Sequence, residues 1–271
     1  MSKKEFLIFL FVLVFLFPFT VIAFWPSQRL TFIACPVGEG DALLLTKGFT
    51  QVLIDGGPDN KVLDCLSQNI PFYDRTIELM INTHPDKDHV AGLVEVLKRF
   101  QVKQILADKF DIESNIAKQF YSLITENQVS LYSPKKGEKI KLDGLEFATL
   151  WPDTRVLGVT SGQSKTNQAS LVFHLRYNDF DAVLTGDITE KEEKEIVSDY
   201  QFEGIEVLKV PHHGSKYSSS NDFLQAVKPQ IAIISVGKNQ WGHPTQEVLD
   251  RLQQIGAKIL RTDQQTIKLS M

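Results

Sequence analysis

The chain has 271 residues, of which 43% are hydrophobic and 23% charged, an ordinary composition for a globular protein of one or two domains. Its formal net charge of −4 excludes a protein that coats nucleic acid through a broad basic surface, although an enzyme that grips a few phosphates is still allowed. Two cysteines, Cys35 and Cys65, are too few to staple an exported domain, and they fit two buried free thiols as well as a disulfide.

Residues 6–25 form a charge-free, largely apolar run that is preceded by Lys3 and Lys4. Twenty residues at about 1.5 Å each can span a bilayer as a helix, and basic residues before such a helix stay in the cytoplasm. The sequence therefore predicts a membrane anchor over residues 1–27 and an extracytoplasmic domain over 28–271. The alternative is a cleaved signal peptide followed by secretion, but the end of the run lacks the small-residue pattern of a cleavage site.

Beyond this run, hydrophobic periodicity predicts alternating strands and helices. In the first half the expected strands are 30–35, 41–46, 51–55, 77–82 and 102–107, and the expected helices are one ending at 63, 90–100 and 113–126. A strand pair is expected within 139–151, followed by a polar loop over 152–167 that would cover the mouth of an active site.

The second half is expected to contain strands 169–176, 181–184, 205–210 and 230–236, helices 190–200, 221–227 and 245–254, and a final strand pair. Two strands followed by Asp55-Gly-Gly57 in the first half are echoed by two strands followed by Gly186-Asp187 in the second. This weak repeat favours two similar α/β halves packed sheet to sheet as one catalytic domain.

The run Thr83-His-Pro-Asp-Lys-Asp-His-Val-Ala-Gly92 lies between a predicted buried strand and a predicted helix. It contains His84, Asp86, Asp88 and His89, four ligand-type side chains within six residues. Burying unpaired carboxylates is costly, and a metal ion offsets that cost. A mixed imidazole and carboxylate set suits zinc or manganese, whereas the plainer interpretation is a solvated acidic loop with two incidental histidines.

The second half adds further candidates at the ends of predicted strands. Asp187 follows the apolar strand and Gly186, and His212 and His213 follow the strand that ends near 210. Because adjacent side chains of an extended segment point in opposite directions, we expect the two histidines to differ in role. We assign His213 as a metal ligand and His212 as a general acid or a supporting group. The mid-strand His174 is interpreted as structural.

The central run resembles the metal-binding signature His-x-His-x-Asp-His of the metallo-β-lactamase superfamily, with Asp86 in place of the second histidine. Within that superfamily it is most similar to the hydrolase domain of ComEC-type DNA-internalisation competence proteins. The loop Pro36-Val-Gly-Glu-Gly40 before Asp41, the tetrad His212-His-Gly-Ser215 and the triplet Gly242-His243-Pro244 carry the same resemblance, which covers residues 29–271.

The resemblance implies an αββα sandwich, preceded here by the predicted transmembrane helix, and two divalent metal ions, zinc or manganese. It also implies that Asp187 bridges the ions and that His243 is the last metal-site histidine. The superfamily usually has another ligand between the central run and the bridging aspartate. Here Asn167-Gln-Ala-Ser170 occupies that place without a histidine, so one ion would have fewer protein ligands.

The function implied is a membrane-anchored metal-dependent hydrolase, most of all a phosphodiesterase or nuclease. Asp88 would bind an ion and orient the attacking water, and Lys165, Lys216 and Lys238 would hold substrate phosphates. If the substrate is DNA in uptake, a separate channel protein would be the partner. The alternatives are a phosphoesterase acting on phosphorylcholine-type cell-surface substrates and a non-catalytic metal-binding domain.

Overall fold

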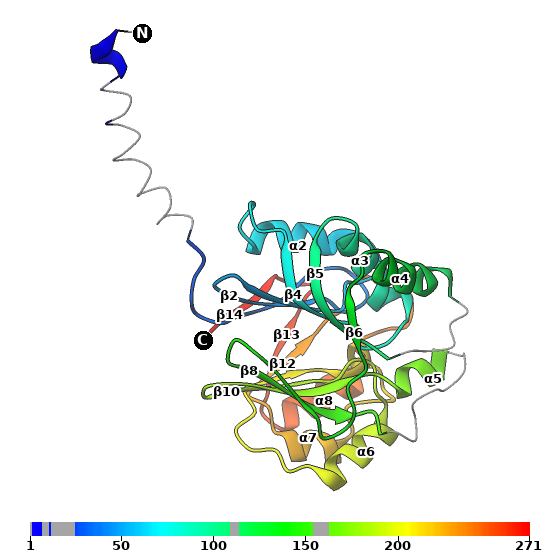
Figure 1. Ribbon diagram of the computed structural model, residues 1–271. Helices are drawn as coiled ribbons and strands as arrows, with labels where there is room; N and C mark the ends of the chain where they lie inside the picture. Colours follow the sequence, from blue (N-terminus) through cyan, green and yellow to red (C-terminus); the bar gives the residue numbers. More distant parts are fainter. Residues whose placement is uncertain (1, 7–10, 12–24, 109–113, 154–162) are drawn as a thin grey trace.

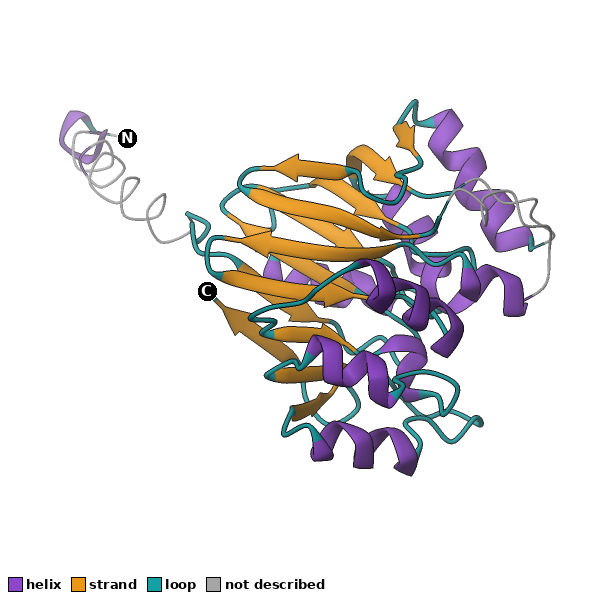
Figure 2. Ribbon diagram, turned by 90° about the horizontal axis from the view of Figure 1, so that it is seen from below, coloured by secondary structure: helices purple, strands orange, loops and turns teal. Residues whose placement is uncertain are grey.

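The computed structural model describes residues 2–6, 11, 25–108, 114–153 and 163–271. Within this part, two seven-stranded sheets lie face to face and helices cover the outer face of each, so the layers run αββα (Figures 1 and 2). The predicted α/β sandwich is confirmed, and the predicted division into 1–27 and 28–271 stays a prediction.

The first sheet has the order β14-β1-β2-β3-β4-β5-β6. Its strands are β1 (Thr31–Ala34), β2 (Leu43–Lys47), β3 (Thr50–Ile54), β4 (Thr76–Ile81), β5 (Gln101–Leu106), β6 (Ser130–Tyr132) and β14 (Ile267–Ser270). The helices on its outer face are α2 (Lys61–Asn69), α3 (Lys87–Leu97) and α4 (Asn115–Glu126) (Figure 1).

The second sheet has the order β13-β12-β11-β10-β9-β8-β7. Its strands are β7 (Lys139–Leu142), β8 (Leu145–Trp151), β9 (Val172–Tyr177), β10 (Phe180–Leu184), β11 (Val207–Lys209), β12 (Ile231–Ile234) and β13 (Lys258–Arg261). The other helices of this half are α5 (Gln163–Gln168), α6 (Glu190–Asp199), the 3-10 turn η1 (Pro211–Gly214), α7 (Asn221–Val227) and α8 (Gln246–Gln254).

The alternation of side chains along each strand places the apolar core in layers. Leu44 of β2 belongs to the cluster between the first sheet and its helices, whereas its neighbours Leu43 and Leu45 belong to the cluster between the two sheets. Successive strand residues point to opposite faces, so a strand with both faces covered must be apolar throughout. Phe147 and Phe173, on the facing sheet, complete the layer between the sheets.

Three predictions about elements were wrong. The final strand pair does not complete the second half, because β13 joins the second sheet while β14 pairs antiparallel with β1 in the first. Part of the predicted polar loop, from Gln163 to Gln168, is helix α5; residues 154–162 lie outside the described residues. The short strand β6 was missed because three residues carry too little periodicity to be recognised.

The two cysteines, whose state the sequence left open, form a disulfide. Cys35, which follows β1, is bonded to Cys65 in α2, and their Cα atoms are 5.8 Å apart. The bond therefore ties the first strand to the helix that covers it.

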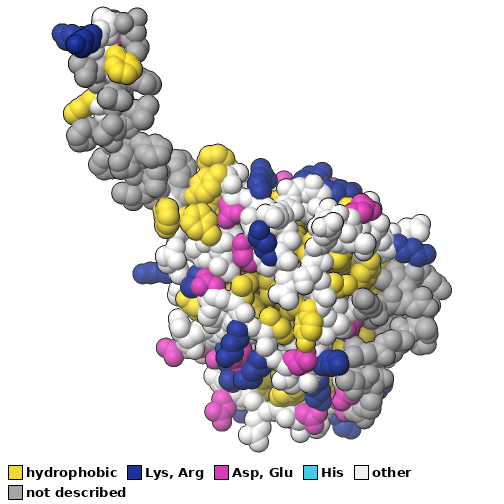
Figure 3. Space-filling view, in the orientation of Figure 1, with side chains coloured by type: hydrophobic (Ala, Val, Ile, Leu, Met, Phe, Trp, Pro, Cys, Tyr) yellow, Lys and Arg dark blue, Asp and Glu magenta, His cyan; other side chains and the backbone are white. Residues whose placement is uncertain are grey.

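The predicted localisation, a membrane-anchored and extracytoplasmic domain, is contradicted. Among the described residues no helix is long and apolar enough to cross a bilayer, and most of the predicted span, 7–10 and 12–24, lies outside them. Where the N-terminal segment joins the body, hydrophobic side chains gather on the surface (Figure 3). Here the Trp25 ring packs edge-on against Phe49 with centroids 5.4 Å apart.

Helix α3 approaches the loop after β3 so closely that it requires a glycine. A Cβ on Gly92 would lie 1.8 Å from the carbonyl oxygen of Gly56, and the backbone there has no room to move because Gly92 N–H donates to Gly57 O at 3.0 Å. This contact fixes the start of α3, and with it the central run, against the end of β3.

We predict that Gly92→Ala lowers the free energy of unfolding by roughly 1–3 kcal/mol or more, because the added methyl group overlaps the backbone of the neighbouring loop. The measurement is the urea midpoint and slope of the full chain. Lys98→Ala at the exposed end of the same helix is the control and should change stability by no more than about 0.5 kcal/mol. Equal stability of Gly92→Ala and the parent would show that the loop can retreat.

Candidate metal centre

Three loops interlock at the carboxyl ends of the first sheet's strands. Gly56 N–H donates to His89 O at 2.7 Å, Gly57 N–H donates to Asp41 O at 2.8 Å, and Asp41 N–H donates to Asp88 O at 3.3 Å. Gly40, with φ of +121°, allows this approach, because a Cβ there would lie 2.1 Å from Asp88 O. The loop at residues 36–41, which joins the antiparallel strands β1 and β2, thus also positions the central run directly.

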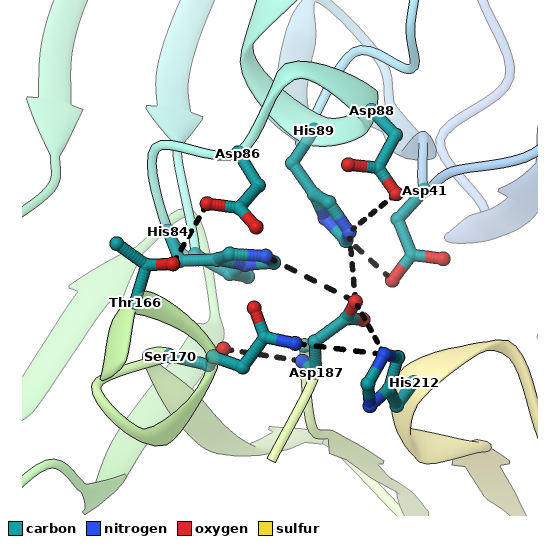
Figure 4. A network of polar contacts seen from close by, with 12 residues as sticks. Asp41, His84, Asp86, Asp88, His89, Thr166, Ser170, Asp187 and His212 are labelled. Atoms are coloured by element: carbon teal, nitrogen blue, oxygen red, sulfur yellow. Dashed lines mark hydrogen bonds and ion pairs between the residues drawn. The ribbon is translucent and has the colours of Figure 1, made fainter. Parts of the chain in front are cut away.

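Three buried imidazoles converge on one carboxylate of the second half, and Figure 4 shows two of them, His84 and His89, directed at Asp187. The Nε2 atoms of His84, His89 and His213 lie 3.9, 3.4 and 3.4 Å from Asp187 Oδ2. Asp88 Oδ2 approaches the same group, 3.8 Å from His89 Nε2 and 3.4 Å from His213 Nε2. The predicted candidates of the two halves are therefore brought together at the junction of the sheets.

The other nitrogen of each ring already has a partner. Nδ1 of His213 donates to the carbonyl oxygen of Ser235 at 2.9 Å, and Nδ1 of His89 lies 2.9 Å from Asp55 Oδ2. Nδ1 of His84 lies 3.1 Å from Thr83 Oγ1. These contacts orient the rings and favour the tautomer whose Nε2 lone pair faces the centre.

The converging atoms lack hydrogen-bond partners although they are buried. Among the described residues this holds for Nε2 of His84, His89 and His213 and for Oδ1 of Asp187. Buried polar atoms are normally satisfied, so these unpartnered imidazole and carboxylate atoms favour a bound cation. Imidazole nitrogens with carboxylate oxygens are ligands that zinc and manganese accept, so the residues present fit a divalent metal centre.

The pKa shifts of the clustered side chains also indicate that a positive charge is favoured at this site. Burial alone would lower the pKa of His89 and His213, but the surrounding carboxylates, above all Asp187, outweigh it: the pKa of His213 rises to about 10 and that of His89 lies well above its usual range. In turn, burial alone would raise the pKa of Asp187, but His213 and His89 hold it well below its usual range. A bound cation would replace these protons, because an imidazole ligand must be neutral.

His84 and Asp86 differ from the centre of the cluster. Burial lowers the pKa of His84 to about 4, so its imidazole is neutral and suited to bind a cation. Burial raises the pKa of Asp86 to about 6, although Thr166 of α5 donates a hydrogen bond of 2.7 Å to its Oδ1. Asp86 therefore connects the central run to α5 (Figure 4).

The prediction that His212 and His213 lie on an extended segment was wrong. The two residues do not continue an extended strand; they lie in η1 with φ of 49° and 53°, in the left-handed region. The side chains therefore do not simply point in opposite directions. His212 Nε2 lies 4.0 Å from Asp187 Oδ2 and 3.5 Å from Asn167 Nδ2, and the His212 side chain is more exposed than that of His213. Burial lowers the pKa of His212.

His243 lies at the rim rather than in the cluster. Its ring centroid is 5.7 Å from that of His212, and its Nδ1 is 3.6 Å from Glu39 Oε1. Asn239 fixes its backbone by accepting from His243 N–H at 3.0 Å and donating to His243 O at 2.8 Å. The mid-strand His174 lies elsewhere, paired with Asp181 at 2.6 Å, as the structural interpretation requires.

The cluster opens into a cavity of about 410 Å³. Its described lining consists of Glu39, Asp86, Asp88, Asn167, Asp187, Thr189, His212, His213, Ser215, Tyr217, Trp241 and His243. The candidate phosphate-binding residues Lys216 and Lys238 are exposed and are not part of this lining. Lys165 lies in α5, and its side chain is outside the described residues.

Two residues that support the centre were not recognised from the sequence. Asp55, at the end of β3 with φ of 58°, accepts hydrogen bonds from Thr83 N–H at 2.8 Å and Thr83 Oγ1 at 2.7 Å and also contacts His89. Lys209 of β11 is 1% exposed, and its Nζ lies 2.7 Å from Asp41 Oδ2. The available signal for Lys209 was a lysine within an otherwise apolar strand beside the paired histidines.

Lys209 compensates a buried carboxylate that itself lies next to the ligand rings. Asp41 Oδ1 is 3.5 Å from His213 Nδ1, and Asp41 Oδ2 is 4.0 Å from His89 Nδ1. Removing the ammonium would leave Asp41 buried and unpaired, which is far more destabilising than removing both members of such a pair.

We predict that Lys209→Met lowers the free energy of unfolding by about 3–5 kcal/mol and that the double variant Lys209→Met with Asp41→Asn regains much of the loss. Urea denaturation of the single and double variants measures the coupling. Lys238→Met is the matched control, because its exposed ammonium should contribute no more than about 0.5 kcal/mol. A Lys209→Met protein as stable as the parent would contradict the assigned ion pair.

Comparison with known proteins shows which proteins the chain is similar to in sequence. The model of the metallo-β-lactamase superfamily matches residues 35–162. ComE operon protein 3 of Bacillus subtilis is 32% identical over 191 residues, which are 70% of this chain and 24% of the relative. Competence protein ComA of Neisseria gonorrhoeae is 37% identical over 123 residues, 45% of this chain and 17% of the relative. The chain thus spans about a quarter or less of these relatives.

A solved structure shows the same fold along the whole body of the chain. The metallo-β-lactamase fold protein YhfI from Bacillus subtilis superimposes with a TM-score of 0.62 and 10% sequence identity, covering 89% of this chain and 100% of that chain. At this level of identity the likeness establishes the fold alone.

Proposed function

This chain contains a domain of the metallo-β-lactamase superfamily related to competence proteins, and we propose that it is a metal-dependent phosphodiesterase that cleaves nucleic acid. The resemblance predicted from the central run and the later histidines is confirmed. The observation that carries the proposal is the set of three buried Nε2 atoms facing Asp187 and Asp88 below an open cavity.

We propose two divalent ions, zinc or manganese, as the cofactor. His84, His89, His213, Asp88 and Asp187 would hold them, with Asp187 shared because its Oδ2 is approached from both halves of the fold. Asp86 and His243, which lie toward the cavity, are proposed as outer ligands. Bound ions polarise a phosphoryl oxygen and lower the pKa of a water, which is the chemistry that phosphodiester hydrolysis needs.

The side chains around this set have separate proposed roles. Asp88 lines the cavity and also contacts His89 and His213. One of its carboxylate oxygens can therefore orient a water toward the phosphorus. His212 faces the cavity beside Asn167 and is proposed to give a proton to the leaving oxygen. The lowered pKa of His212 limits its protonated fraction at neutral pH. The alternative is that His212 binds a metal ion, and the two assignments predict different metal contents for a His212 variant.

A nucleic acid substrate is proposed from the competence relatives. One of these relatives is competence protein ComA, which 45% of this chain matches at 37% identity. A phosphorylcholine-type phosphodiester is the second candidate, because the lining combines acidic and aromatic side chains that can hold a quaternary ammonium.

The central test is metal analysis and phosphodiesterase assay of the full chain. We predict that the zinc- or manganese-loaded protein hydrolyses methyl p-nitrophenyl phosphate and single-stranded DNA. Asp187→Ala should lower metal content and reduce the rate more than about 100-fold, because it removes the carboxylate shared by the ligand rings. His174→Gln, which changes a histidine outside the cluster, is the control and should keep the metal. Full metal content and activity in Asp187→Ala would refute the ligand set.

The two adjacent histidines should separate in the same assays. We predict that His213→Ala loses metal and activity together, since its Nε2 lies 3.4 Å from both Asp187 and Asp88. His212→Ala should keep the metal but cleave DNA about 10²–10⁴-fold more slowly, with a smaller loss when p-nitrophenolate leaves without a proton. Equal metal loss in both variants would assign both histidines as ligands.

A further inference from the structure

Two large aromatic side chains stand exposed at the cavity. Tyr217 is 65% exposed and Trp241 is 66% exposed, and among the exposed large apolar side chains of the described residues only these two belong to the cavity lining. Leaving rings of this size in water forgoes the favourable free energy of burying them. Isolated exposed aromatics are common, but a pair at the mouth of a ligand cluster is a candidate binding surface.

Both rings are carried by backbone that is held in place. Asn239 Oδ1 accepts from Trp241 N–H and from His243 N–H, each at 3.0 Å, so the tryptophan loop is tied to the rim histidine. The carbonyl oxygen of Tyr217 accepts from Glu190 N–H at 3.0 Å, which ties the segment after η1 to the start of α6. Hydrogen bonds therefore hold the backbone that carries each ring beside the cavity.

We propose that Tyr217 and Trp241 form a stacking rim that binds unpaired nucleobases on either side of the phosphodiester to be cut. The proposal rests on the proposed phosphodiesterase function and specifies its substrate as a single strand. Every base has a π-face that can stack on an aromatic ring, whereas the bases of a duplex are already stacked on one another. A rim of this kind therefore binds a single strand without selecting its sequence.

The charge beside the rim favours a nucleotide over a choline-type substrate. Lys216 Nζ lies 5.1 Å from the centroid of the Tyr217 ring. An ammonium in this position attracts a phosphate that follows a stacked base, and it repels a second cation approaching the same ring. Among the acids of the lining, Glu39 lies 3.6 Å from His243 Nδ1, and Asp88 and Asp187 approach the ligand imidazoles.

The test compares three substrates that share p-nitrophenolate as the leaving group, all with the metal-loaded full chain. They are methyl p-nitrophenyl phosphate, thymidine 5′-(p-nitrophenyl phosphate) and p-nitrophenylphosphorylcholine. The thymidine ester has one base, so we expect its KM to rise roughly 5- to 150-fold, the range of one base–aromatic stack, in whichever of Tyr217→Leu and Trp241→Leu removes the ring that this base contacts. The kcat for this ester and both constants for the methyl ester should stay within about twofold. Trp241→Phe should restore most of the affinity, because it restores a ring.

Phe72→Leu is the matched control, since Phe72 is 75% exposed and pairs edge-on with Tyr73 outside the cavity lining. It should change none of the constants. A parallel loss on the methyl ester would show a structural role for the rim residues and overturn the stacking proposal. A loss confined to the phosphorylcholine ester would overturn it in favour of a quaternary-ammonium site.

A binding measurement separates this proposal from the proposed hydrolysis. The described part of the chain includes all three tryptophans, Trp25, Trp151 and Trp241. Titration with a single-stranded oligothymidylate should quench the fluorescence of the parent, and the quenching should disappear in Trp241→Phe. Quenching without hydrolysis would refute the phosphodiesterase while supporting the rim. Hydrolysis with equal affinity in the parent and Trp241→Leu would refute the rim alone.

Discussion

The structure depends on a group of closely spaced carboxylates at the junction of its two halves. Asp187, Asp88, Asp55 and Asp41 all approach the rings of His89 and His213, and Lys209 is the buried lysine among them within the described residues. Carboxylates so close together are stable only with compensating cations. The two halves of the fold therefore meet at a cluster where protonated imidazoles and Lys209, or a cation bound in place of the ring protons, balance the carboxylates.

This constraint explains the close backbone contacts around the centre. Gly40, Gly56 and Gly92 let three loops approach within hydrogen-bonding distance, which places ligand atoms from residues far apart in the sequence on a common point. The Nδ1 contacts then leave Nε2 of each ring directed inward. Orientation is thus set by groups that do not themselves face the cavity, such as Ser235 and Asp55.

Much of the fold and of the candidate site could be predicted because the relevant signals are local. Apolar runs marked the inner strands, and the spacing of His84 to His89 marked the centre. The pairing of β14 with β1 could not be predicted, since it joins residues more than two hundred positions apart and no local pattern specifies it. The left-handed backbone of His212 and His213 was missed because residues other than glycine seldom adopt that region, and two in succession do so only when tertiary contacts hold them there. Lys209 was missed because its role depends on Asp41, which only the folded chain brings near.

The pairing of Thr31 with Ser270 also sets the timing of folding. Strand β1 has β2 on one edge, and its other edge stays open until β14 has been synthesised. During translation the first sheet therefore has an open edge that can pair with other chains. The closing contact spans nearly the whole sequence, so it is slow to form by chance. The Cys35–Cys65 disulfide can hold β1 against α2 during that interval, because both partners emerge early.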